Sequence, residues 1–204
     1  RMKSNSWELD PQKFLSRKDA DRLQAVAKEH AESGDKVATR DCFIIRLGLA
    51  TGLRVMEIAA LKCGDLSLEY TIPYLVVVSG KGKKRRRVFF NSAFKKHCKE
   101  YLAWKQYIGE SIEPDQPLLL SSSTGGHLTT RAIQKAFKRC ARKASLPLHY
   151  SIHCLRHTYA CFLLKASNWN LRLVQKQLGH SKITTTQVYA DVMMPEIKKA
   201  LDRL

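Results

Sequence analysis

Near its C-terminal end the 204-residue chain reads Leu178-Gly-His-Ser-Lys-Ile-Thr-Thr-Thr-Gln-Val-Tyr-Ala-Asp191. His180 stands nine residues before Tyr189, and no acidic residue separates them. A tyrosine is a weak nucleophile near neutral pH, because the pKa of its phenol is about 10. It attacks phosphorus only where cations stabilise the developing charge and a neighbouring group accepts its proton. The rest of the sequence supplies candidates for both tasks.

Two motifs upstream of this stretch contain arginines. In Thr51-Gly-Leu-Arg54, the arginine stands at a predicted helix start, where backbone N–H groups and a guanidinium can bind one phosphate together. In His153-Cys-Leu-Arg156-His157, His153 and Arg156 are three residues apart, so they are neighbours on a helix surface and can face one ligand. Taken alone, Arg54 is better explained as a surface arginine, and His157 is predicted to be a core histidine. The functional argument therefore depends on the motifs together.

A glycine-flanked lysine lies between these two motifs. Ser79-Gly-Lys-Gly-Lys83 is predicted to form a hairpin tip, which Gly80 and Gly82 allow to bend sharply. Lys81 at this tip can reach into a groove, although a solvated hairpin lysine fits the local sequence equally well. His180 follows a glycine and is predicted to lie, with its ring exposed, at a corner between two helices.

The charge of the chain indicates a polyanionic partner. Its 36 lysines and arginines exceed its 18 aspartates and glutamates, which gives a formal net charge of +18. Such an imbalance causes self-repulsion, and two long segments, residues 70–99 and 116–190, contain no acid at all. A merely solvated surface normally mixes both signs, so acid-free segments of this length favour a face that binds nucleic-acid phosphates. The residues predicted to contact DNA are Lys83, Lys84, Arg85, Arg131, Lys135 and Arg139.

Several other classes of protein are disfavoured. No apolar run approaches the roughly 20 residues of a membrane span, and the N-terminal residues lack a signal-peptide core. The six cysteines form no Cys-x-x-Cys pair, which favours buried free thiols over disulfides. His153, Cys154, His157 and Cys161 share one side of a helix, but a core face has the same pattern, and no familiar zinc spacing is present. We therefore expect no bound metal.

Apolar spacing predicts a mostly helical fold with one small antiparallel sheet of three strands. With 44% hydrophobic residues and no linker-like tract, the chain suits one domain. Ser16 is predicted to begin the first helix, and Thr39 and Gly52 to bound the second. The predicted helices cover residues 16–33, 39–52, 54–61, 91–108, 129–143, 151–163, 171–178, 183–189 and 195–204, and the predicted strands cover 66–69, 74–78 and 85–90.

The order of the motifs resembles that of a known family. Thr-Gly-Leu-Arg-x-x-Glu is followed by the Gly-Lys-Gly-Lys hairpin, by His-x-x-Arg-His, and by Leu-Gly-His-Ser with a tyrosine nine residues after the histidine. This arrangement resembles the catalytic domain of the tyrosine recombinases, the phage integrase and Xer-type family, over residues 16–204. The resemblance implies the fold of that domain. It also implies an active site made of Arg54, Lys81, His153, Arg156, His180 and the nucleophile Tyr189.

The resemblance implies a reaction as well. Tyr189 attacks a DNA phosphodiester, which gives a 3′-phosphotyrosyl intermediate and a free 5′-hydroxyl. Arg54 and Arg156 hold the non-bridging oxygens, whose charge must be stabilised in the transition state. Lys81 protonates the 5′-oxygen that leaves, and His153 relays the proton of the tyrosine. The covalent link conserves the bond energy, so a second strand can reverse the step without ATP, metal or any other cofactor.

Other residues follow the family pattern less directly. His180 is expected to hydrogen-bond the phosphate, and Glu57 and Asp65 match acidic positions that support the first arginine. Cys154 stands where the family commonly has aspartate, which should alter packing more than chemistry. Two other functions share part of this pattern. A type IB topoisomerase would use the same chemistry to relax supercoils, and a catalytically silent module would bind DNA without forming a covalent adduct.

The resemblance also suggests how the chain is organised and where it acts. Residues 1–15 are expected to be a linker or remnant from a missing N-terminal DNA-binding domain, and residues 16–204 the catalytic domain. The expected partners are double-stranded DNA and further protomers, with a tetramer at the synapse, a monomer when isolated, and no membrane. The expected location is the cytoplasm, at the nucleoid, of a bacterium or with a phage- or plasmid-borne element. Near Pro195, which suits the first turn of a helix, an apolar helical stripe is expected to dock on its own domain or on a neighbouring protomer; its members are Met193, Ile197, Leu201 and Leu204.

Overall fold

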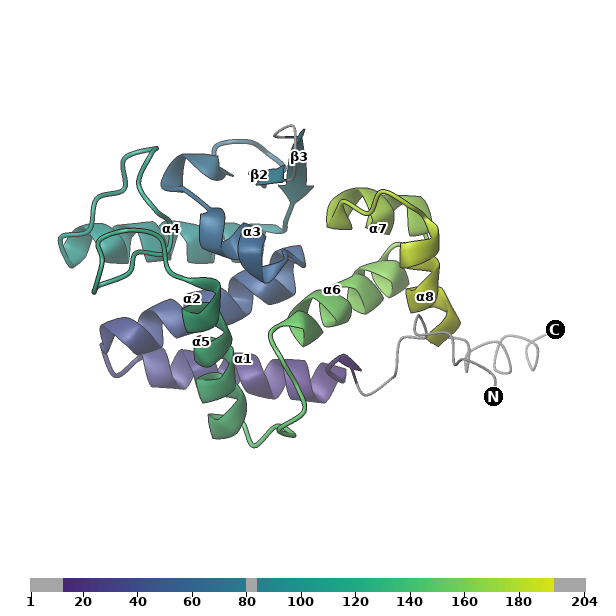
Figure 1. Cartoon of the computed structure of the whole chain (residues 1–204), viewed down its shortest axis with the longest axis horizontal. Coiled ribbons are helices and arrows are strands. Elements are labelled where there is room, and N and C mark those ends of the chain that lie inside the picture. The colour runs from purple at the N-terminus through teal and green to yellow at the C-terminus, as the bar shows by residue number, and fades with distance from the viewer. Residues whose placement is uncertain (1–12, 80–83, 193–204) are drawn as a thin grey trace.

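The computed structural model describes residues 13–79 and 84–192 of the chain (Figure 1). In chain order the described elements are α1 (Arg17–Ala31), α2 (Lys36–Thr51), α3 (Val55–Ala60), a 3₁₀ helix (Cys63–Asp65), β1 (Leu66–Ser67), β2 (Tyr74–Ser79), β3 (Lys84–Phe89), α4 (Ser92–Tyr107), α5 (Thr130–Lys143), α6 (His153–Ala166), α7 (Leu171–Leu178) and α8 (Thr184–Val192). The mostly helical fold with one three-stranded antiparallel sheet, which the sequence predicted, is confirmed.

Local capping explains where the helices begin. Five of them start where a side-chain oxygen accepts a backbone N–H of the first turn: Ser16 for α1, Asp35 for α2, Asn91 for α4, Thr129 for α5 and Asn170 for α7. The predicted start of α2 at Thr39 is wrong, because Asp35 caps the helix by accepting the N–H of Ala38. The hydroxyl of Thr39 donates instead to the carbonyl of Asp35, inside the helix.

The β2–β3 hairpin brings an arginine onto the inner face of the sheet. Leu75 lies opposite Val88, and Val77 lies opposite Arg86. Because successive side chains of a strand alternate between faces, Arg86 shares the buried face with these apolar residues, whereas Arg85 is exposed. The predicted hairpin tip at 80–83 lies outside the described residues.

The main core is organised around α2, which contacts α1, α4, α5 and α6. Ile44, Ile45 and Leu47 of α2 are fully buried, and each such side chain contributes about 2 kcal/mol of hydrophobic stabilisation. Gly48 allows α6 to approach closely, since a Cβ at this position would lie 2.6 Å from Cδ1 of Leu155. The close α2–α6 contact fixes the start of α6 beside the end of α2.

A second, smaller core holds α7 and α8 against the far end of α6 (Figure 1). Its buried members are Tyr159, Ala160, Cys161, Leu164, Val174, Leu178 and Tyr189. Gly52 and Gly179 end α2 and α7 with φ angles of 62° and 66°, a region that glycine adopts without strain. A Cβ at Gly52 would also overlap the ring of Tyr159. The two helix ends therefore meet beside α6.

Several other sequence predictions concern single residues or short segments. The six cysteines all lie in the described part and are buried with free thiols, as predicted. Leu15 is also fully buried, so packing of the domain includes the residue before the first helix cap. No helix within residues 13–79 and 84–192 is both long and apolar enough to cross a bilayer. Residues 1–12 and 193–204 lie outside the described residues, and with them most of the predicted linker and the predicted helix 195–204.

Candidate active site

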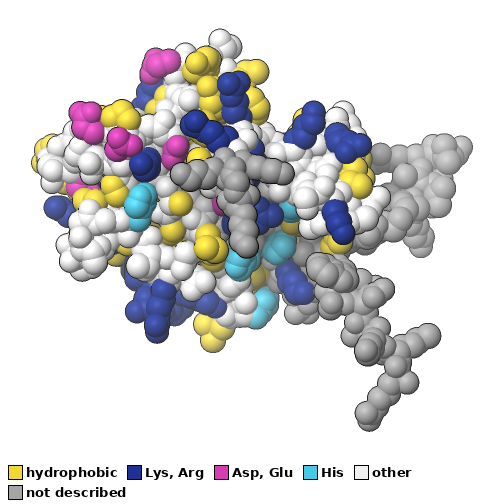
Figure 2. Space-filling view, turned by 45° about the horizontal axis from the view of Figure 1, so that its top comes forward, with side chains coloured by type: hydrophobic (Ala, Val, Ile, Leu, Met, Phe, Trp, Pro, Cys, Tyr) yellow, Lys and Arg dark blue, Asp and Glu magenta, His cyan; other side chains and the backbone are white. Residues whose placement is uncertain are grey.

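Four of the six predicted catalytic residues meet where α2, α6, α7 and α8 converge. Arg54 follows the end of α2, Arg156 lies in α6, His180 follows the end of α7, and Tyr189 lies in α8. The charges of Arg54 and Arg156 are close enough to alter the pKa of both His180 and Tyr189. On the face shown in Figure 2, histidine side chains lie near the middle with Lys or Arg side chains beside them. The fold thus brings together residues that lie up to 135 positions apart in the chain (from 54 to 189).

Arg156 is a buried cation that two backbone carbonyls hold in place. Its Nη1 donates to the carbonyl of Gly52 at 2.6 Å, and its Nη2 donates to the carbonyl of Leu178 at 2.8 Å. Its side chain forms none of the ion pairs found among the described residues. Burial, followed by repulsion from Arg54, lowers the pKa of Arg156 to about 10. A buried charge without a counterion is unfavourable, so this position is suited to bind an anion.

Arg54 is positioned by Glu57, which it shares with a second arginine. One oxygen of Glu57 accepts the backbone N–H of Arg54 at 2.8 Å, and the other accepts its Nη1 at 3.3 Å. Arg86 donates to both oxygens of Glu57, at 2.7 and 3.0 Å. Burial alone would raise the pKa of Glu57, but the hydrogen bonds from Arg86 and from the backbone of Arg54 lower it overall. One carboxylate therefore serves two guanidinium groups, and a positive charge is left over beside Arg156.

His180 is a neutral imidazole under ordinary conditions. Burial and the charges of Arg156, Arg54 and Arg86 lower its pKa to about 4. Its Nδ1 lies 2.9 Å from the hydroxyl of Thr186, which is fully buried in α8. Where that hydroxyl donates to Nδ1, the ring proton is on Nε2, which is then available to a ligand. The ring is parallel to that of Tyr189, with the two centroids 6.3 Å apart.

The hydroxyl of Tyr189 is hydrogen-bonded to His157. The side chain of Tyr189 is buried, and burial raises the pKa of its phenol to about 12. Burial and the charge of Arg156 lower the pKa of His157 to about 4, so the imidazole is neutral. Its Nδ1 lies 3.1 Å from the hydroxyl oxygen of Tyr189 and can accept a hydrogen bond from that hydroxyl. In this arrangement the tyrosine is a protonated phenol whose proton already has an acceptor.

The assignment of His157 to the core is therefore incomplete. It is half-buried, as a core histidine would be, but it contacts the predicted nucleophile. His153, the predicted proton relay, is exposed at the first position of α6, and the hydroxyl of Tyr189 bonds to His157 instead. A sequence signal was available, because residues 153 and 157 are four apart and thus lie on one helix face. Arg86 could also have been found, since strand alternation puts it on the face of Val88.

The predicted DNA contacts fall into three groups. Arg85, Arg131 and Lys135 are exposed, as a phosphate contact requires. Arg139 is instead paired within the protein, donating from Nε and Nη2 to the two oxygens of Asp41 at 2.7 and 2.8 Å. The side chains of Lys83 and Lys84 lie outside the described part of the structure, as does that of the predicted catalytic residue Lys81.

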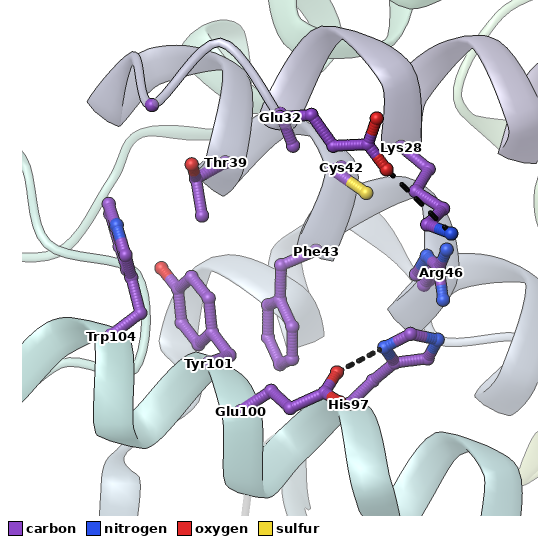
Figure 3. A pocket seen from close by; sticks show the side chains of 12 residues that line it. Lys28, Glu32, Thr39, Cys42, Phe43, Arg46, His97, Glu100, Tyr101 and Trp104 are labelled. Carbon is purple, nitrogen blue, oxygen red and sulfur yellow. Dashed lines mark hydrogen bonds and ion pairs between the residues drawn. The ribbon is translucent and has the colours of Figure 1, made fainter.

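A separate pocket of about 360 Å³ lies between α1, α2 and α4 (Figure 3). Phe43, Tyr101 and Trp104 line it, and Lys28–Glu32 and His97–Glu100 pair on its rim. It contains none of the predicted catalytic residues, so it is distinct from the site described above. Within residues 13–79 and 84–192, no group of three His, Cys, Asp or Glu side chains is arranged to hold a metal ion.

Known proteins resemble this chain in sequence and in fold. A family model described as "Phage integrase family" matches residues 13–196. The chain is 35% identical over 181 residues to "Tyrosine recombinase XerC" of Bacillus subtilis (strain 168), which covers 88% of this chain and 57% of that protein. It is 35% identical over 164 residues to the protein of the same name from Lactobacillus leichmannii, covering 80% and 54%. The chain thus spans just over half the length of these relatives.

Solved structures agree with the sequence relatives. The XerH site-specific recombinase, bound to its difH substrate in a pre-cleavage complex, matches with a TM-score of 0.75 at 27% identity, over 93% of this chain and 52% of that one. The XerA recombinase matches with a TM-score of 0.73 at 27% identity, over 92% and 65%. With the motifs in the expected order on this fold, the chain belongs to the phage integrase family, the tyrosine recombinases, and has the fold of their catalytic domain.

Proposed function

We propose that this chain is the catalytic part of a site-specific DNA recombinase that cleaves and rejoins strands through a 3′-phosphotyrosyl intermediate. The observation that carries the proposal is the buried Arg156, which lacks a carboxylate partner and lies in one site with Tyr189. Relatives named tyrosine recombinases, and a structural neighbour that is bound to its DNA substrate, support the same activity. The net charge of +18 supports DNA as the partner.

A phosphodiester bound beside Arg54 and Arg156 would supply the anion that the site lacks. The two η nitrogens of Arg156 are fixed by the carbonyls of Gly52 and Leu178, so the guanidinium is held rigidly before a ligand arrives. Preorganised donors of this kind stabilise the charge that develops on the non-bridging oxygens during transfer. In the tautomer in which the hydroxyl of Thr186 donates to Nδ1, the Nε2 of His180 is a further donor to the same oxygens.

Binding the phosphate would also activate the nucleophile. Arg156 is the largest charge that lowers the pKa of His157, so an anion that offsets Arg156 raises the basicity of His157. His157 then accepts the proton of Tyr189 as the phenol oxygen forms its bond to phosphorus. We therefore propose His157 in the relay for which the sequence suggested His153, and leave His153, at the first position of α6, as a donor to the phosphate.

The bond from phosphorus to the 5′-oxygen breaks as the tyrosyl bond forms, and the leaving oxygen needs a proton. We propose Lys81 for this step, from the family resemblance and from its position between β2 and β3. A 5′-thiolate leaves without protonation, so a substrate with this leaving group should restore cleavage by Lys81→Ala if the role is correct. A 5′-hydroxyl of a second strand reverses the reaction, which conserves one phosphodiester and requires neither ATP nor a cofactor.

The proposal extends to partners and location. The relatives are nearly twice as long as their matched part, which supports a whole protein with a separate DNA-binding domain, linked through residues 1–15. The relatives come from bacteria, which supports action on DNA in the cytoplasm, at the nucleoid. We further propose that protomers assemble on paired sites as a tetramer and are monomeric when isolated. The stripe of Met193, Ile197, Leu201 and Leu204, outside the described residues, is the candidate contact between protomers.

The decisive experiment uses the whole protein and a nicked suicide duplex that contains its recombination site. We expect a covalent protein–DNA adduct on a denaturing gel with the wild type and none with Tyr189→Phe, while DNA binding is nearly unchanged because only one oxygen is lost. An adduct that persists in Tyr189→Phe, or that maps by peptide mass to another tyrosine, contradicts the assignment. Relaxation of supercoils without strand exchange would identify a topoisomerase instead.

A further inference from the structure

We propose that Arg86 is a positioning residue that joins three parts of the candidate site. These parts are the β2–β3 hairpin, the turn that presents Arg54, and the corner after α7 that presents His180. The effect on cleavage rests on the proposed function, whereas the contacts themselves belong to the folded chain. Neither the charge pattern nor the family motif pointed to this arginine, which stands between two others on β3.

The first contact is the bidentate ion pair with Glu57. Both η nitrogens of Arg86 donate to the two carboxylate oxygens, at 2.7 and 3.0 Å, and the Arg86 side chain is only 16% exposed. Glu57 lies in the first turn of α3 and is itself nearly buried. Two parallel hydrogen bonds between partly buried charged groups fix both position and orientation. The pair therefore attaches β3 firmly to the start of α3.

The second step runs from Glu57 to Arg54. The same carboxylate that holds Arg86 accepts both the backbone N–H and the Nη1 of Arg54. The side chain of Arg54 is 44% exposed, so few other contacts restrain it. A displaced Glu57 would release the guanidinium that is proposed to meet the phosphate. Arg86 thus acts on Arg54 through Glu57, without touching the substrate.

The third contact is with the corner after α7. A Cβ built on Gly179 would lie 2.7 Å from Nε and 2.8 Å from Cδ of Arg86, so the arginine packs directly over the glycine backbone. This packing also explains why Nε of Arg86 is buried without a hydrogen-bond partner. The side chain of Gln177 bonds the backbone N–H and carbonyl of Phe89 at 3.1 and 3.3 Å, so β3 and α7 are joined twice.

An arginine is suited to this position and a lysine is not. The planar fork can bind both oxygens of Glu57 while its flat face and stem lie against Gly179. A lysine ammonium keeps the charge but can place only a point charge near one oxygen. Arg54 and the corner that presents His180 therefore share one support. Lys81, the proposed general acid, stands five residues before Arg86 in the sequence.

The experiment compares Arg86→Ala and Arg86→Lys with a matched control in the whole protein. Arg87→Ala is the control, because it removes the same charge one residue away, on the other face of β3, where Arg87 stacks over Tyr74 at 4.9 Å. The readout is the rate of adduct formation on a nicked suicide duplex at saturating protein, beside the dissociation constant for DNA. This separates the chemical step from binding.

We expect Arg86→Ala to form the adduct about 100-fold more slowly at saturation, the scale of a roughly 1 Å misplacement of reacting groups. Arg86→Lys should recover only a small part of that rate, and Arg87→Ala should cleave at the wild-type rate once bound. A wild-type rate for saturated Arg86→Ala, or full recovery with Arg86→Lys, overturns the inference. If the wild type itself forms no adduct, the proposed function fails, and the packing test below then decides the inference.

The packing test is a thermal double-mutant cycle that needs no activity. Gly179→Ala should lower Tm, because it introduces both the backbone strain at φ 66° and the overlap with Arg86. In an Arg86→Ala background only the strain remains, so the Tm loss should shrink by at least about 2 °C. An equal loss in the two backgrounds means that Arg86 does not pack on Gly179, and the inference is wrong.

Discussion

Two arginines, Arg139 of α5 and Arg156 of α6, donate hydrogen bonds to α2 or to the residue that ends it, but only one of them has a carboxylate partner. Arg139 of α5 donates from Nε and Nη2 to both oxygens of the buried Asp41, and this hydrogen-bonded carboxylate raises the pKa of Arg139. Arg156 of α6 is bonded to two carbonyl oxygens, and burial lowers its pKa to about 10. Both are held by two hydrogen bonds, but only one has a counterion.

The difference separates a structural charge from a functional one. The Asp41–Arg139 pair is electrically complete and can stabilise the fold without a ligand. Arg156 is rigid but incomplete, and perturbed ionisable groups of this kind gather at functional sites. The acid-free segment 116–190 contains both arginines, so the charge pattern alone could not tell them apart. Asp41, supplied by α2 from outside that segment, makes the distinction.

The largest expected effect is on the rate of strand cleavage. Arg156→Lys should slow adduct formation at saturating protein by about 100- to 1,000-fold, because a lysine cannot reproduce the fixed fork of donors aimed at the phosphate. Arg139→Lys keeps the same charge and should cleave within a few-fold of the wild type. The measurement is single-turnover cleavage of a nicked suicide duplex by the whole protein. Equal losses in the two variants would remove the distinction between the two arginines.

Loss of the Asp41–Arg139 ion pair should lower the free energy of unfolding. Arg139→Ala leaves the carboxylate of Asp41 buried without its partner, and the side chain of Arg139 is 40% exposed. Because the pair is intermediate between a buried and an exposed ion pair, we expect the free energy of unfolding to fall by about 1–3 kcal/mol. Lys135→Ala is the control, since Lys135 is exposed in the middle of the same helix and should change stability little. Denaturant unfolding measures both, and no loss in Arg139→Ala would mean that the pair contributes nothing to the fold.

An added anion should stabilise the protein by binding beside Arg156, which lacks a counterion, and not beside Arg139. Pyrophosphate at ten times its dissociation constant should stabilise the wild type by about 1.4 kcal/mol, or roughly 3–5 °C in Tm. Arg139→Lys should show the same shift, whereas Arg156→Lys should lose most of it. Thermal scans against sodium chloride of equal ionic strength remove the general salt effect. An equal shift in both variants would place the bound anion elsewhere.

The sequence predicted what depends on local chemistry and missed what depends on distant contacts. The cap at Ser16 and the glycine that ends α2 were predicted because each acts within one helical turn. Thr39 was wrongly predicted to begin α2, whose cap is Asp35, four positions earlier. The Asp41–Arg139 pair spans 98 positions and follows only from the packing of α5 on α2.

The same limit applies to the candidate site. The motif order identified Arg54, Arg156, His180 and Tyr189, and the fold brings these four together, but their catalytic roles remain predictions. The shared helix face of His153 and His157 could have suggested a second histidine, but the choice between them depends on how α8 turns back onto α6, where the hydroxyl of Tyr189 meets His157.

The smallest expected effect is a pH dependence that belongs to the site around Arg156. His157 and His180 have folded pKa values of about 4, below the ordinary value of 6.5. Below pH 6.5 the unfolded chain therefore binds protons that the folded chain does not, and stability falls as pH falls toward 4. Because both rings are partly exposed, we expect the two histidines together to change the free energy of unfolding by less than about 1 kcal/mol between pH 7.5 and 6.0.

Thermal scans measure this dependence, and in His157→Gln and His180→Gln the Tm should fall less steeply with pH than in the wild type. His97, whose pKa is also lowered by burial, contributes equally to all three proteins. Saturating pyrophosphate should make the wild-type curve shallower as well, because an anion beside Arg156 offsets the charge that lowers both histidine pKa values. A slope that pyrophosphate leaves unchanged would show that the anion does not reach Arg156.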